Sequence, residues 1–258
     1  MRVGPHYENT ILVVGAAEKA ALKNGGAKLN RGGRPRADLG LLLDALFYRL
    51  RNAGPWRDLP EHFGPWSTVH SWHSRWAREG LWGRLLEVFA RKVRGRVRLV
   101  DGTHILVHQC AANPAGGAAA QAMGKTRGGR NTKLMALNEA KGRLLSAALI
   151  EGQAYEGHHV IKLIKHGSKL HIAGDKGFDD NKLRALLRAL GHNPCFPGKA
   201  NRKQKVRYSK KLYRTRYRIE NFFCRLKRWA CAATRRDKLA QNFLSLIHFA
   251  AVIDWLQS

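Results

Sequence analysis

Acidic residues are scarce in this sequence. Asp and Glu together number 18, against 47 Lys and Arg, so the formal net charge is +29. A chain this basic repels itself, which excludes a partner of like charge and predicts a polyanion, most often nucleic acid. An RNA-binding structural protein would show the same excess, so charge alone leaves RNA and DNA both open.

Cysteine and long apolar runs are scarce as well. The four cysteines form no Cys-x-x-Cys pair, which argues against the common zinc sites and favours free thiols in a reducing cytosol. The apolar run at 11–14 is too short for a signal peptide, and we expect no membrane-spanning segment. These features predict a cytoplasmic, nucleoid-associated protein with no membrane partner.

Apolar periodicity is present, and it divides the chain into three parts. Residues 1–30 show no clear period, and we expect a poorly ordered leader there. Residues 31–95 begin with a basic joint and then show a helical period, as in the leucines between Leu39 and Leu50. From residue 96 short apolar strands alternate with helices, which predicts an α/β domain with a mixed sheet over 96–258.

The part over 31–95 has the layout of a helix-turn-helix. Asp38 is the expected N-cap of the first helix, and a short helix follows at 59–63. Gly64-Pro65 makes a turn before a helix that Ser67 is expected to cap. The polar surface of this last helix is expected to carry Thr68, His70, Ser71, His73, Ser74 and Arg75. With the net charge, this layout predicts a DNA-binding domain.

The α/β part has a regular succession of elements. The predicted strands cover 98–103, 132–138, 143–150, 169–174 and 193–197, and the predicted helices cover 158–166, 180–190, 209–229 and 239–256. The stretch 109–131 is rich in Gly and Ala and is predicted to be a loop.

Two acids stand out by their position. Asp101 and Asp175 are each predicted to end an apolar strand, and a glycine follows each within two residues. Ligand sites in open α/β sheets form at the carboxyl ends of strands, so neighbouring strands would place these carboxylates side by side. Such a pair repels itself unless a hard divalent cation joins it. The alternative is that each acid merely caps a turn.

Glu220 is the single acid among fifteen Lys and Arg between residues 199 and 236. At about 100° per residue, one face of the predicted helix is apolar and packs on the sheet. A narrow stripe at the border of that face holds Tyr213, Arg216, Glu220 and Lys227. An ordinary ion pair between Arg216 and Glu220, four residues apart, would explain the position of Glu220 alone. Together with Asp101 and Asp175, it instead predicts a site.

Three carboxylates of this kind can hold two Mg²⁺ ions, or Mn²⁺ in their place. Two metals stabilise the attacking and the leaving oxygen of an in-line phosphoryl displacement, with no covalent protein intermediate. Arg216 and Lys227 would then hold phosphates near the metals.

The motifs in this chain resemble those of a known family. The spacing of Tyr213, Arg216, Glu220 and Lys227 (Y-x2-R-x3-E-x6-K) is similar to the signature of the DDE transposases of bacterial insertion sequences, in the group of insertion sequence five. LVDGTH (99–104) and AGDKGFD (173–179) resemble its first two catalytic blocks. GKTRGGRNTK (124–133) resembles its basic loop. GRPRAD, PWRDLP and GPWSTVHSW, between Gly33 and Trp72, resemble its N-terminal region.

This resemblance implies a ribonuclease-H-like catalytic domain with flanking helices, preceded by the small helical domain. It also implies a Mg²⁺-dependent enzyme that binds the terminal inverted repeats of an element, cleaves the strands and transfers them to target DNA. Catalysis and metal binding would fall to Asp101, Asp175 and Glu220. The DNA-binding candidates are Tyr213, Arg216, Lys227, Lys125, Arg127, Lys133, Thr68 and Arg75. Two element ends must be joined, so a homodimer or larger assembly on DNA is expected.

Two departures from the family pattern leave an alternative open. Residues 1–30 do not resemble the family's usual start, and Tyr155-Glu156 stand where the family tends to have His-Asp after Gly-Gln-Ala. The alternative is a cleavage-deficient DNA-binding remnant of a transposase.

Overall fold

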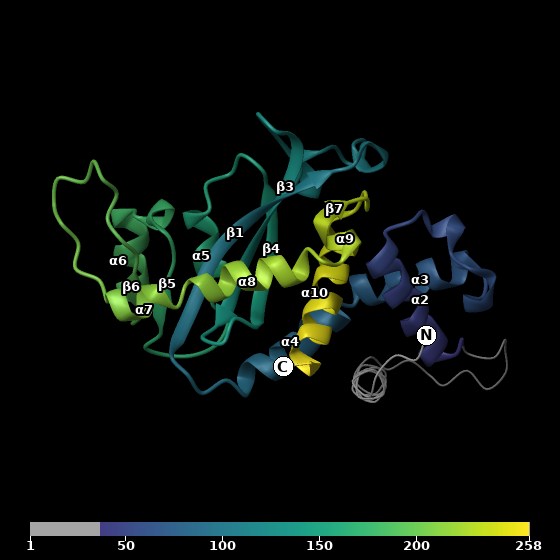
Figure 1. Cartoon of the computed structure of the whole chain (residues 1–258). Helices are drawn as coiled ribbons and strands as arrows, with labels where there is room; N and C mark the ends of the chain where they lie inside the picture. The colour runs from purple at the N-terminus through teal and green to yellow at the C-terminus, as the bar shows by residue number, and fades with distance from the viewer. Residues whose placement is uncertain (1–36, 258) are drawn as a thin grey trace.

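A mixed sheet forms the centre of the protein (Figure 1). The computed structural model describes residues 37–257, so the predicted leader at 1–30 and the basic joint at 31–36 lie outside the described part. Within it the sheet has seven strands, β1 Val97–Val107, β2 Gly124–Thr126, β3 Gly129–Glu139, β4 Leu144–Glu151, β5 His171–Ala173, β6 Asn193–Cys195 and β7 Thr234–Arg235.

Strand β1 occupies the middle of the sheet and is the scaffold for everything that follows. It pairs antiparallel with β3, which pairs antiparallel with β4, and it pairs parallel with β5, which pairs parallel with β6. The order β4-β3-β1-β5-β6 is that of a ribonuclease-H-like sheet. The predicted fold class, a mixed sheet with flanking helices and an N-terminal helical region, is confirmed.

Two predictions were wrong: where the first strand ends, and that residues 109–131 form a loop throughout. β1 does not end at Thr103 but continues to Val107, because β3 pairs with it as far as Leu106 opposite Asn131. Asp101 therefore lies inside a strand and not at its end. The stretch predicted as a loop over 109–131 contains β2, which forms a hairpin with the start of β3.

Helices cover the sheet and extend beyond one side of it. They are α2 Leu39–Asn52, α3 Trp66–Arg78, α4 Leu81–Arg91, α5 Gly157–Leu163, α6 Asn181–Ala189, α7 Lys210–Arg214, α8 Tyr217–Leu226, α9 Ala230–Ala233 and α10 Ala240–Leu256. Short 3₁₀ turns lie at Trp56–Asp58, Glu61–Phe63, Gln109–Ala111, Ala119–Gln121 and Lys176–Phe178. None of the helices in the described part is long and apolar enough to cross a bilayer.

A side-chain cap begins α2, α6 and α7, whereas the other described α-helices begin without one. The Asp38 carboxylate accepts a hydrogen bond from the Leu41 amide at 3.0 Å, so Asp38 caps α2 as predicted. Ser67 does not cap α3, which already begins at Trp66. Pro65 immediately precedes this helix, at φ −58°, and no side-chain cap bond forms there.

The predicted long helix over 209–229 is divided into α7 and α8. At the junction the chain tightens into a 3₁₀ turn, in which the Arg216 amide donates to the Tyr213 carbonyl at 3.0 Å. The apolar face predicted for this region is retained in α8, whose Ile219, Phe222 and Leu226 are buried.

The N-terminal helices share one hydrophobic core with the C-terminal helix α10. Trp82 packs on Phe249 with ring centroids 4.6 Å apart, and Phe89 stacks on Trp255 at 5.3 Å. His73, predicted on a polar surface, is completely buried instead, because that side of α3 faces α10. Burial, and then the charges of nearby His70 and Arg49, lower the pKa of His73 to about 3, so the ring is neutral.

Candidate active site

Asp101 and Asp175 lie on adjacent parallel strands at matching positions. The last paired residues of β1 and β5 are Leu99 and Ala173, and each acid follows its strand's last paired residue by two positions. The backbone register therefore brings these two positions to the same end of the strand pair, and the charge of Asp175 acts on the Asp101 carboxyl group. This is the arrangement that the two strand motifs predicted, although β1 itself continues past Asp101.

The Asp101 carboxyl group sits in a partly desolvated position. Burial raises its pKa to about 6, against the opposing effects of a hydrogen bond from the Gly102 amide at 2.9 Å and of Arg216. The negative charges of Asp175 and Glu156 raise this pKa further. Asp101 is thus a carboxylate whose ionised form gains from a nearby cation.

Arg216 joins Asp101 to Glu220. One of its terminal nitrogens donates to Asp101 Oδ2 at 3.0 Å, and the other donates to Glu220 Oε1 at 2.7 Å. The ion pair between Arg216 and Glu220 that offered the simple explanation is therefore present, and it is shared with Asp101. Glu220 remains half exposed. One guanidinium thus lies between two of the three candidate carboxylates.

Lys227 binds the same strand a few residues further on. Its ammonium donates to Thr103 Oγ1 at 2.7 Å and to the His104 carbonyl at 3.1 Å. Burial lowers the pKa of Lys227. The stripe of Arg216, Glu220 and Lys227 that was predicted from the helical period therefore faces β1, where Asp101 lies.

Glu156 lies beside Asp101 and was not predicted as part of the site, whereas its partner Lys133 was predicted to bind DNA. The Glu156 carboxylate lies against Gly102, where an added Cβ would come within 2.9 Å of Glu156 Cδ. It pairs with the Lys133 ammonium at 3.1 Å, and Lys133 also donates to the Ala154 carbonyl at 2.9 Å. The signal available in the sequence was the Tyr155-Glu156 departure from the family pattern, which carried no indication of position.

The other DNA-binding candidates are spread over three surfaces. Lys125 and Arg127 are exposed on the β2–β3 hairpin. Thr68 is half-buried on α3, where Arg75 pairs with Glu79 at 2.8 Å and lies over the Trp72 ring. Tyr213 is half-buried beside Tyr208. Lys133 differs from these because it is buried and already paired, so its charge is engaged inside the protein.

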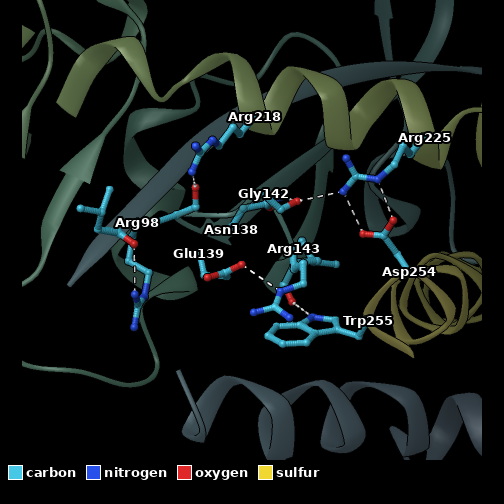
Figure 2. Close-up of polar contacts among 12 residues, drawn as sticks. Arg98, Asn138, Glu139, Gly142, Arg143, Arg218, Arg225, Asp254 and Trp255 are labelled. Atoms are coloured by element: carbon cyan, nitrogen blue, oxygen red, sulfur yellow. Dashed lines mark hydrogen bonds and ion pairs between the residues drawn. The ribbon is translucent and has the colours of Figure 1, made fainter. Parts of the chain in front are cut away.

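Two arginines of α8, the helix that carries Glu220, bind the β3–β4 turn and α10 (Figure 2). Arg218 donates to the Ala140 carbonyl at 2.7 Å, in the β3–β4 turn. Arg225 binds both oxygens of Asp254 on α10, at 2.7 and 2.9 Å, and donates to the Gly142 carbonyl at 3.2 Å. These two arginines tie α8 to the turn and to α10.

Gly142 allows α8 to approach the turn, which leads to a stability prediction. Its φ is +90°, and an added Cβ would lie 2.7 Å from the Arg218 carbonyl oxygen. Gly142→Ala should therefore lower the free energy of unfolding by more than the roughly 1–3 kcal/mol that a left-handed conformation alone costs. Urea denaturation measures this loss.

Two control variants separate strain from collision in that experiment. Gly191 also has a positive φ, +75°, but nothing lies within 4 Å of an added Cβ, so Gly191→Ala carries strain alone. Gly95 has an ordinary φ and an equally open neighbourhood, so Gly95→Ala should be nearly neutral. Equal losses in Gly142→Ala and Gly191→Ala would show that the close contact with α8 does not matter.

The donor set fits a hard divalent cation in its chemistry. Asp101 and Asp175 offer carboxylate oxygens, and because burial raises the pKa of Asp101, a bound cation would stabilise its ionised form. Over residues 37–257, however, no three His, Cys, Asp or Glu side chains are grouped closely enough to hold a metal ion. Glu220 is paired with Arg216.

Two family models match this chain, one in its N-terminal part and one in the part that carries the sheet. The model described as "Putative transposase of IS4/5 family" matches residues 19–86, and the model described as "Transposase DDE domain" matches residues 93–254. This chain belongs to the DDE transposase family. The predicted family is confirmed, and the matched DDE region contains Asp101, Asp175 and Glu220.

Two proteins resemble this transposase over 88 residues each. "Uncharacterized protein y4sN" of Sinorhizobium fredii is 40% identical, over 34% of this chain and 69% of that protein. "Putative transposase for insertion sequence element IS6501" of Brucella ovis is 30% identical, over 34% of this chain and 68% of that protein.

Solved transposase structures resemble it only distantly. The piggyBac transposase synaptic complex with hairpin DNA matches at a TM-score of 0.44 and 10% identity, over 98% of this transposase and 65% of the piggyBac chain. The Mos1 strand transfer complex matches at a TM-score of 0.33 and 15% identity, over 92% of this transposase and 76% of that chain. The transposase therefore spans just under two thirds of the piggyBac chain.

Proposed function

We propose that this protein binds the terminal inverted repeats of an insertion sequence and catalyses metal-dependent DNA strand cleavage and strand transfer. The observation that supports this most directly is the parallel register of β1 and β5, which sets Asp101 beside Asp175. Arg216 adds the link from Asp101 to Glu220, which lies on α8.

In this proposal Asp101, Asp175 and Glu220 would hold Mg²⁺ or Mn²⁺. The ions supply charge stabilisation at the attacking and leaving oxygens of the phosphodiester. The chain's own cations orient the substrate. Lys227, fixed by Thr103, and Arg216 lie beside the carboxylates, where they can hold phosphate oxygens. Arg218 and Arg225 hold α8, which carries Glu220, against the β3–β4 turn and α10.

The DNA partner is proposed from the charge and from the surfaces that present it. A net charge of +29 favours the phosphate backbone. Lys125 and Arg127 on the exposed hairpin, Tyr213 near the carboxylates, and Thr68 and Arg75 on α3 are proposed contacts. Lys133 would contribute only by leaving Glu156. We propose a division at residues 31–95 and 96–258 into DNA-binding and catalytic domains, and a dimer or larger assembly on DNA.

The runner-up is a cleavage-deficient remnant that binds DNA without cutting it. The bridge from Asp101 through Arg216 to Glu220 favours it, because a protein cation there competes with metal.

A metal-removal experiment separates the two functions. The substrate is a duplex carrying the inverted repeats that flank the gene, incubated with the whole chain in Mg²⁺ and again in EDTA. Strand cleavage with Mg²⁺ and its complete loss in EDTA are expected, with substrate still shifted in a native gel in Mg²⁺. Binding without any cut product in Mg²⁺ or Mn²⁺ would instead identify the remnant.

A further inference from the structure

Two hollows meet on the side of α8 that faces α10. Arg225 and Asp254 line both of them, so they form one continuous groove, here called the α8–α10 groove. One half extends to Arg51 and Arg228, and the other extends to Lys141 and Arg143. Figure 2 shows three residues that line the groove, Arg143, Arg225 and Asp254, with Gly142 of the β3–β4 turn.

The charged residues that line the groove are mainly cations, and some of them have no ion-pair partner among residues 37–257. Asp254 is the acid in its lining, and Arg225 binds both of its oxygens. Arg143 is paired with Glu139 at 2.9 Å. Arg51, Lys141 and Arg228 are exposed and make no ion pair or side-chain hydrogen bond with any residue in 37–257.

The groove lies away from the candidate carboxylates. Arg225 follows Glu220 by five residues, which at about 100° per residue turns it roughly 140° around α8. Glu220 and Lys227 face β1, whereas Arg225 faces α10. DNA phosphates held at the catalytic stripe therefore do not occupy the groove cations.

The floor of the groove indicates which part of DNA it fits. Phe222 is buried, and Trp229 packs edge-on against Phe47 at 5.2 Å. The groove thus carries charge at its rim, and its two rings are buried or half-buried, whereas single-strand binding surfaces usually present open ring faces for base stacking. Its chemistry matches backbone phosphates.

We propose that the α8–α10 groove is a second DNA-binding surface, which holds the phosphate backbone of duplex DNA through Arg51, Lys141 and Arg228. This rests on the proposed function only in taking DNA as the partner. The surface contributes affinity and leaves the chemistry at the carboxylates unchanged.

The test compares two triple variants of matched charge. The groove variant is Arg51→Gln, Lys141→Gln and Arg228→Gln. The control is Arg94→Gln, Lys182→Gln and Arg188→Gln, which removes exposed cations elsewhere. Fluorescence anisotropy with a labelled duplex gives the affinity over a range of salt. The slope of log affinity against log salt should become shallower by about 2–3 in the groove variant, because each lost phosphate contact removes about 0.9. The control slope should stay at the wild-type value.

Two further readouts make the outcome decisive. At saturating duplex, the single-turnover cleavage rate of the groove variant should equal that of the wild type. If circular dichroism shows that the triple variant does not fold, Arg228→Gln alone should make the slope shallower by about 0.9.

Several results would overturn the proposal. They are an unchanged slope in the groove variant, or an equal change of slope in the control. A third is a larger loss of affinity for a labelled single strand of the same sequence than for the duplex. Wild-type protein that binds no duplex would overturn the proposed function as well. Because the main readout is binding, a chain that binds without cutting still tests the groove.

Discussion

Asp101→Asn should reduce DNA cleavage by about a thousandfold or more while leaving duplex binding within a few-fold of wild type. The substitution keeps the shape of the side chain but removes the charge that Arg216 binds and that a metal ion would bind in the proposed function. Losing several kcal/mol of transition-state stabilisation has an effect of this size, since about 1.4 kcal/mol corresponds to a tenfold change in rate. Asp175→Asn and Glu220→Gln should behave in the same way.

The measurement is single-turnover cleavage of the inverted-repeat duplex, with anisotropy for binding. Asp58→Asn is the matched control, because this exposed carboxylate lies in the N-terminal part, outside the carboxylate group. Full cleavage by the Asp101, Asp175 and Glu220 variants would eliminate the proposed chemistry. A loss of cleavage that accompanies a loss of folding would be recognised by circular dichroism.

Asp179→Ala should lower the free energy of unfolding by about 3–5 kcal/mol, as expected when one partner of a buried pair is removed. Asp179 Oδ1 accepts hydrogen bonds from Arg184 Nε at 2.9 Å and Arg202 Nη1 at 2.7 Å, and Oδ2 accepts from the Lys199 amide at 2.8 Å. Arg184 is itself almost completely buried, so it would remain charged without this counterion. Such a loss is a large part of the roughly 5–15 kcal/mol of a typical domain.

The same network makes a prediction about pH. Burial raises the pKa of Asp179, but the hydrogen bonds from Lys199, Arg184 and Arg202 outweigh it and the net pKa is lowered. A carboxyl whose folded pKa lies below its unfolded value stabilises the fold above that unfolded value, and this contribution is lost as the pH falls toward the folded pKa. Urea unfolding at neutral and acidic pH should show the wild type losing more stability in acid than Asp179→Ala does. Asp180→Asn, a change at the neighbouring α6 cap, should resemble wild type in both tests.

Local patterns in the sequence predicted the part of the site that depends on local geometry. Apolar runs that lead into Asp101 and Asp175 identified two strands, and the helical period placed Glu220 and Lys227 on one stripe. An apolar run and a helical period each extend over a few residues, so a single sequence carries them. The structure then added the parallel register that sets the two aspartates side by side.

The failures came from contacts between residues far apart in the chain. β1 continues past Asp101 because β3, some thirty residues later, keeps pairing with it. His73 is buried because α10 packs against α3. Lys133, predicted to bind DNA, pairs with Glu156 beside Asp101. Neither periodicity nor composition determines such partners, since each depends on how separate elements pack.

The shared core of the N-terminal helices and α10 has a practical consequence for dividing the chain. A truncated version starting near residue 96 would retain every strand of the described sheet yet strip the aromatic cover from Phe249 and Trp255. Newly exposed rings of this kind promote aggregation. Isolating the part of the molecule that carries the sheet therefore calls for polar replacements along that uncovered side, because removing the N-terminal segment alone does not suffice.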